Sequence, residues 1–186
     1  MRLDVVLAGD HVRLPQSVPV PADAGGERII PATAVRDADP DASPPEIRTA
    51  SGETVFVSAT QRADLELFCT ANRIPRQSRP DVWGDLLEPF LDTEFTPERQ
   101  VATRTRLRQV GLGDEEVADI RAEVAPLIRA YNAVHQDQHH LGLADLLDAA
   151  TAAWIPEHQQ IDAADGGAFR RWAMEIADLG FPRNRP

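Results

Sequence analysis

The sequence predicts an α+β fold, in which a small N-terminal antiparallel β-sheet with a proline-rich arm precedes a helical bundle of five to six helices. Near the N-terminus, short runs rich in Val, Leu and Thr flank glycine-containing turns, as is typical of β-hairpins. From residue 60 onward, apolar residues recur at spacings of three and four, as in amphipathic helices. We expect an N-terminal region over residues 1–59 and a helical domain over residues 60–186, or one continuous domain.

Two hairpins account for the predicted sheet. The first pairs residues 2–8 with residues 11–14, and the second pairs residues 46–50 with residues 53–59 across the Ser51-Gly52 turn. Strand-forming residues are dense in the last of these arms.

Between the hairpins, residues 15–45 contain seven prolines and a Gly-Gly pair. Proline lacks a backbone donor and clashes with the preceding helical turn, so long helices are excluded here. We expect an extended arm wrapped on the surface, with residues 36–45 as its most linker-like piece.

The helix expected over residues 114–138 organises the C-terminal part. Its apolar seam consists of Val117, Ile120, Val124, Leu127, Tyr131 and Val134. Asp114 is the expected N-cap, and Pro126 should bend the helix because its missing donor breaks one backbone hydrogen bond.

Further helices should pack around this seam. They are expected from about residue 60 to 72, after the cap Asp81 up to an interruption at Pro89, from the Thr96 cap to Val110, from Leu143 to Trp154, and from about Gly167 to Leu179. Aromatic residues make up only 5% of the chain, and we expect its tryptophans, Trp83, Trp154 and Trp172, to be core anchors.

The charge balance constrains the partners. A formal net charge of -11 argues against nucleic-acid binding, which needs clustered cations. It favours solubility or a basic protein partner, and it leaves homo-oligomer formation open. All 19 basic residues are arginine, which indicates a GC-rich, bacterial genome.

The compartment expected is the cytoplasm. A single cysteine, Cys69, excludes an internal disulfide and lies among apolar neighbours, so we expect a buried, inert thiol. No apolar run is long enough for a membrane span, and Asp4 interrupts what would be the apolar region of a signal peptide.

A candidate metal site lies in the run from His135 to His140. Histidines four apart on a helix point to the same side, so His135 and His139 are candidate ligands of one divalent transition metal. Further ligands would come from Asp92, Glu94, Glu157 or His158. The alternative is a polar helix terminus, whose histidines interact favourably with the negative end of the helix dipole.

The HxxxHHLG pattern of this run resembles a stretch of the DinB-like four-helix-bundle metal proteins. The resemblance covers about eight residues and implies a site of three histidines. That family's other histidine, on an earlier helix, has no counterpart, since the only upstream histidine is His11.

Four arginines form a second candidate site: Arg99, Arg104, Arg106 and Arg108. Their guanidinium groups suit a carboxylate or phosphate ligand. The alternative is an ion-pair face against the acids of the following helix, Glu115, Glu116, Asp119 and Glu123.

Carboxylates before this helix, Asp85, Glu88, Asp92 and Glu94, have the chemistry of a general acid and base or of a metal site, and equally that of a solvated helix face. No phosphate loop, serine elbow or paired-cysteine zinc motif occurs in the chain. We therefore expect a non-enzymatic interaction or accessory protein with an acidic surface, of a regulatory or immunity type and without a cofactor. The alternative is a metal-binding helical-bundle protein or metal-dependent enzyme using His135 and His139.

Overall fold

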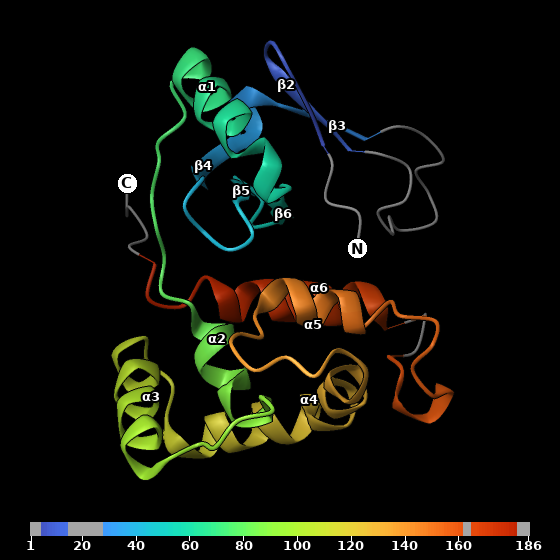
Figure 1. Cartoon of the computed structure of the whole chain (residues 1–186). Coiled ribbons are helices and arrows are strands. Elements are labelled where there is room, and N and C mark those ends of the chain that lie inside the picture. Colours follow the sequence, from blue (N-terminus) through green and yellow to red (C-terminus); the bar gives the residue numbers. More distant parts are fainter. Residues whose placement is uncertain (1–4, 15–27, 162–164, 182–186) are drawn as a thin grey trace. The chain divides into compact units, whose positions relative to one another are not determined.

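The predicted α+β fold is confirmed. The computed structural model describes residues 5–14, 28–161 and 165–181, which form two three-stranded antiparallel sheets followed by six α-helices (Figure 1). The contacts divide the chain into two units, Met1–Ser78 and Arg79–Pro186. This division falls later than residue 59 because the first helix packs with the strands: its residues Leu65 and Phe68 belong to the same core cluster as Val12 and Ile47.

The first sheet has the strand order β1-β2-β3, with β1 (Val6–Ala8), β2 (His11–Leu14) and β3 (Arg28–Pro31). The first predicted hairpin is thereby confirmed. Val12 lies opposite Ile30, and both side chains are buried in the core of the unit. Ile30 belongs to the segment expected to form the arm, of which residues 15–27 lie outside the described residues.

The second sheet has the order β4-β5-β6, with β4 (Val35–Asp39), β5 (Glu46–Thr49) and β6 (Thr54–Phe56). The second predicted hairpin is confirmed, but the prediction of a linker from residue 36 is wrong. Polar β4 is buried because Asp37 forms an ion pair with the buried Arg48, which also binds Glu46 at 2.6 Å.

Helix α1 (Arg62–Asn72) follows the short 3₁₀ turn η2 (Ala59–Gln61), which the Ser58 hydroxyl caps by accepting a hydrogen bond from Thr60 N. Cys69 is buried on the sheet-facing side of α1, as expected, and burial raises the pKa of its thiol. Such a thiol is poorly suited to nucleophilic chemistry.

In the second unit, the short helix α2 (Val82–Leu87) supplies the centre of the core. The Trp83 side chain is 1% exposed, donates a hydrogen bond from Nε1 to Ala173 O at 2.7 Å, and meets the Trp172 ring edge-on. Helix α2 ends at Leu87, and the 3₁₀ helix η3 (Glu88–Phe90) follows with Pro89 in its first turn. The predicted Asp81 cap and the interruption at Pro89 are both confirmed.

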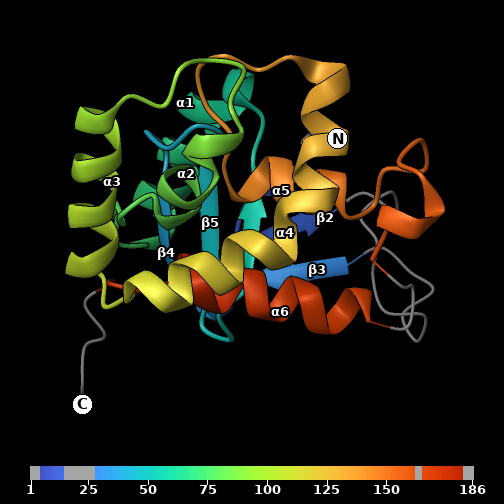
Figure 2. The same cartoon turned by 90° about the horizontal axis from the view of Figure 1, so that it is seen from below.

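Helix α3 (Pro97–Gln109) begins at the Thr96 cap, as predicted, and Gly111 takes the left-handed conformation that ends it, with φ +97°. Helix α4 (Asp114–His135) has Gly113 rather than Asp114 as its N-cap, because the Glu116 carboxylate accepts the Gly113 N–H. It continues through Pro126 and changes direction along its length (Figure 2).

The apolar seam of α4 is largely confirmed. Val124, Leu127 and Tyr131 are buried, whereas Val134 in the last turn is 65% exposed, contrary to the prediction. The helix ends at His135 rather than near residue 138, because Gln136 is left-handed with φ +51°.

Helix α5 (Leu143–Ala149) is shorter than expected, so Trp154 lies beyond it and is 47% exposed rather than a core anchor. The 3₁₀ turn η4 (Glu157–Gln159) leads towards α6 (Gly166–Ala177), which buries Ala173, Met174 and Ile176. None of the described helices has both the length and the apolar character needed to cross a lipid bilayer.

We predict that Arg48→Met lowers the free energy of unfolding of the first unit by about 3–5 kcal/mol, because the buried Asp37 and Glu46 would both lose the guanidinium that pairs with them inside the core. Hydrogen–deuterium exchange of the β5 and β6 amides measures the change. The control is Arg62→Gln, since Arg62 and its partner Asp41 are both exposed and the expected loss is below about 1 kcal/mol. Equal effects of the two substitutions would contradict a structural role for the buried pair.

Candidate functional site

A groove of about 420 Å³ in the second unit brings together acidic side chains, arginines and histidines. Three acids of the α2 region, Asp81, Asp85 and Glu88, line it at spacings of four and three, which place them on one side of a helix. The opposite wall comes from α3 and from the segment after α4. The lining residues outside the acids include Leu91, Arg99, Arg106, Gln109, Val110, His139, His140, Leu141 and Gly180.

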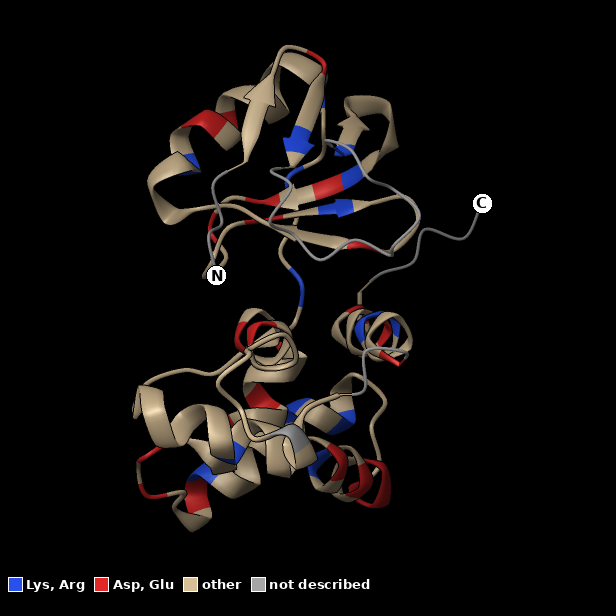
Figure 3. Cartoon of the chain, turned by 90° about the vertical axis from the view of Figure 1, so that its right-hand side faces the viewer, with Lys and Arg blue, Asp and Glu red and all other residues tan. Residues whose placement is uncertain are grey.

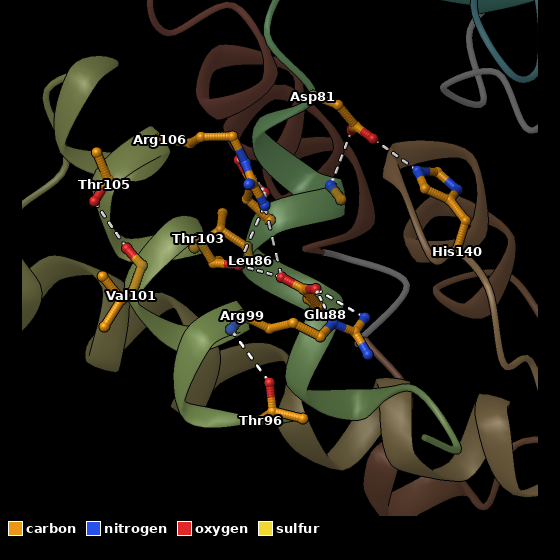
Figure 4. A network of polar contacts seen from close by, with 12 residues as sticks. Asp81, Leu86, Glu88, Thr96, Arg99, Val101, Thr103, Thr105, Arg106 and His140 are labelled. Carbon is orange, nitrogen blue, oxygen red and sulfur yellow. Dashed lines mark hydrogen bonds and ion pairs between the residues drawn. The ribbon is translucent and has the colours of Figure 1, made fainter. Parts of the chain in front are cut away.

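Each acid in the groove is paired, and Figure 4 shows the contacts of Asp81 and Glu88. Arg106 binds Asp85 through both Nε and Nη2, with the shortest contact at 2.5 Å. The Glu88 carboxylate accepts from Arg99 Nε at 2.8 Å and from the Thr103 hydroxyl. These contacts join α3 to the charged side of α2 along the groove.

Burial is the main influence on Asp85. It raises the pKa of this carboxyl above its usual value and outweighs the hydrogen bonds and the charge of Arg106, while Asp81 and Glu88 raise the pKa further. The same contact raises the pKa of Arg106. The ion pair with Arg106 therefore offsets the unfavourable removal of the Asp85 carboxylate from water.

At the other end of the groove, His140 Nε2 lies 2.7 Å from Asp81 Oδ2. Burial opposes ionisation of Asp81, but the hydrogen bonds from His140 and from Gly84 N–H hold the pKa of Asp81 below its usual value. The hydrogen bond to Asp81 raises the pKa of His140, and the nearby Asp145 and Asp137 act in the same direction. The pair fastens the segment after α4 to the start of α2.

The four predicted arginines divide into two groups. Arg99 and Arg106 bind the acids of the α2 region, whereas Arg104 and Arg108 approach Asp114 at 3.9 Å and 2.6 Å. Ion pairing is therefore present, but its partners are largely not those expected. Among the described residues, Glu115, Glu116, Asp119 and Glu123 pair with none of these arginines.

The helical spacing assumed for the metal site is absent, because α4 ends at His135 and His139 lies beyond it. The His135 ring stacks on Tyr131 with centroids 4.2 Å apart, whereas His139 lines the groove. No group of three or more His, Cys, Asp or Glu side chains is placed to hold a metal ion in the part of the chain that the structure describes. The site remains a prediction without its geometric support.

The residues proposed as further metal ligands do not gather around His135 and His139 in the described part of the chain. Asp92 and Glu94 are exposed beyond η3 and do not line the groove, His158 is exposed in η4, and the Glu157 side chain lies outside the described residues. Of the four acids considered for catalysis, the groove thus brings together only Asp85 and Glu88.

Sequence reasoning missed the pair of Asp81 with His140 and the role of Arg121. Arg121 donates to the carbonyl oxygens of Leu86 and Asp85, at 3.0 Å and 3.1 Å. The spacing of Asp81, Asp85 and Glu88 was the available signal for an acidic helix face. Comparison with family models, curated proteins and solved structures gives no match.

We predict that His140→Ala lowers stability by about 0.5 kcal/mol near pH 5, because both side chains of the pair with Asp81 are about half exposed. The loss should disappear near pH 9. Because the pKa of His140 is raised in the folded protein, protonated His140 stabilises the fold fully below its unfolded pKa of 6.5, and this contribution is lost as the pH rises through its folded pKa. Because the pKa of Asp81 is lowered, ionised Asp81 stabilises the fold above its unfolded pKa of 3.8, and this contribution is lost in acid. Urea denaturation at both pH values, with His139→Ala as control, measures this. A loss independent of pH would contradict it.

We also predict unequal effects of two charge-matched double substitutions in α3. Arg99→Gln with Arg106→Gln should cost about 2–3 kcal/mol, because Asp85 and Glu88 are only 15% and 13% exposed and would lose their cations. Arg104→Gln with Arg108→Gln should cost no more than about 1 kcal/mol, since both arginines are more than half exposed. Thermal denaturation followed by tryptophan fluorescence compares them. Equal losses would contradict the division into two groups.

Proposed function

We propose that this chain is a non-enzymatic interaction protein that binds a basic protein partner through an acidic face on α4, formed by Glu115, Asp119 and Glu123. The observation that carries the proposal is that these three exposed side chains have no ion-pair partner among the described residues. An exposed acidic face of this kind attracts a cationic protein and speeds their association.

The spacing of the acidic face supports the same function. Its members are four residues apart, so their side chains lie one turn apart on one side of the helix. Like charges at this spacing destabilise a helix by about 0.2–0.5 kcal/mol per pair. A cationic partner would relieve this repulsion, whereas in the free chain the three like charges only destabilise the helix.

The arginines of α3 do not neutralise this face, and neither does Arg121, which donates to backbone carbonyls of α2. Arg99 and Arg106 are held by Glu88 and Asp85, and Arg108 is held by Asp114. Figure 3 shows acidic and basic residues on several helices of the second unit. The negative charges of Glu115, Asp119 and Glu123 are therefore exposed to solvent on α4.

The groove supports a non-enzymatic role as well. A general base needs a free lone pair directed at its substrate. The Asp85 and Glu88 carboxylates are instead hydrogen-bonded to guanidinium and hydroxyl groups of α3. In this arrangement their role is to join helices.

We predict that Glu115→Gln, Asp119→Asn and Glu123→Gln together weaken binding of an octa-arginine peptide at least about tenfold at low salt. The matched control neutralises three exposed acids elsewhere, Asp64, Asp92 and Glu94, and should change the affinity by less than about twofold. Isothermal titration calorimetry at about 50 mM and about 500 mM salt measures both and the expected screening. Equal weakening by the two variants, or absence of binding by the unmodified protein at low salt, would contradict the proposal.

A further inference from the structure

A second cavity, of about 170 Å³, lies between α3 and α4 and is distinct from the acidic face. Its apolar lining includes Leu107, Leu112 and Val117, all of which are buried. Its charged lining consists of Arg104, Asp114 and Arg121. Apolar walls with a few polar groups are typical of small-molecule sites, although this volume is smaller than that of a drug-sized site.

Arg121 is the less exposed cation of this cavity. Its Nε and Nη2 donate to the backbone carbonyls of Leu86 and Asp85 in the last turn of α2. Its Nη1 has no hydrogen-bond acceptor within the described part of the chain, and no carboxylate forms an ion pair with it there. The Arg121 guanidinium therefore binds no carboxylate of the described residues, whereas Arg106 donates to the Asp85 carboxylate through two nitrogens.

Arg104 is the second cation, on the α3 side. Its Nε lies 3.9 Å from Asp114 Oδ1, at the edge of ion-pair distance, while Arg108 holds Asp114 Oδ2 at 2.6 Å. The cavity thus has two guanidinium groups and one carboxylate, and a third arginine outside the lining already engages that carboxylate.

Burial is the main electrostatic influence on Arg121. Burial lowers the pKa of its guanidinium, and although Glu88 and Asp85 oppose the shift, the charge of Arg104 lowers the pKa further. Arg104 and Arg121 therefore repel each other across the cavity wall. An anion between them would be attracted by both guanidinium groups and would offset that repulsion.

We propose that this cavity binds a small monocarboxylate whose apolar body contacts Leu107, Leu112 and Val117 and whose carboxylate is held by Arg104 and Arg121. A guanidinium presents its donors in a fixed plane that matches the two oxygens of a carboxylate. The apolar wall distinguishes such a ligand from inorganic anions, and the small volume restricts it to about the size of one aromatic ring.

The test uses three probes in NMR titrations that follow the methyl signals of Leu107, Leu112 and Val117. Benzoate has both the charge and the apolar body, acetate has only the charge, and benzyl alcohol has a similar body without the charge. Benzoate should bind most tightly and shift these methyl signals. Benzyl alcohol binding as tightly as benzoate, or no benzoate-induced shifts up to about 10 mM, would overturn the proposal.

Three single variants, all expected to fold, then test the roles of Arg104 and Asp114 in benzoate binding. Arg104→Gln should weaken benzoate binding about fivefold or more, because the exposed arginine contributes to ligand binding rather than to the core. Asp114→Asn should strengthen binding about threefold, since it removes the carboxylate in the lining. The control Arg129→Gln removes one charge from α4 outside the cavity and should change affinity less than about twofold. Equal effects of Arg104→Gln and Arg129→Gln, or weaker binding by Asp114→Asn, would overturn the assignment.

Discussion

The second unit depends on the compensation of carboxylates that are partly removed from water. Helix α2 buries Val82 and Trp83 in the core, and this placement draws Asp85 and Glu88 into a poorly solvated position. A carboxylate in such a position is costly unless a cation and hydrogen-bond donors accompany it. Helix α3 supplies both from one side, through guanidinium groups and the Thr103 hydroxyl.

This requirement determines where the remaining charges lie. The arginines that compensate the α2 acids are unavailable to α4, so Glu115, Asp119 and Glu123 have no ion-pair partner in the described structure. Helix α4 in turn directs Arg121 to the carbonyl end of α2, where orphan backbone acceptors attract a positive charge. An acidic surface and a partly buried cation therefore arise from the same packing of three helices.

Several features governed by local chemistry could be predicted from the sequence, whereas those governed by distant pairing could not. The caps at Asp81 and Thr96 depend on backbone donors within three residues, and both were predicted. Strand β4 was missed because its polar sequence gives no alternating pattern. The buried Asp37 pairs with Arg48, eleven residues away on the adjacent strand, as well as with its neighbour Arg36. Trp154 was misplaced for a different reason, since α5 ends earlier than its apolar spacing indicated.

The arginines of α3 show how far a sequence could have specified the site. Arg99 and Arg106 are seven residues apart and share a face with Thr103, whereas Arg104 and Arg108 are four apart on another face. The helical spacing alone would have divided the four arginines into two pairs on different faces of α3, but it could not have identified the acids with which each pair interacts. Because the first face meets the acids of α2 and the second meets only the start of α4, the second pair shares one carboxylate. That imbalance, with Arg121 on the facing helix, leaves the cavity between α3 and α4 with more cations than anions.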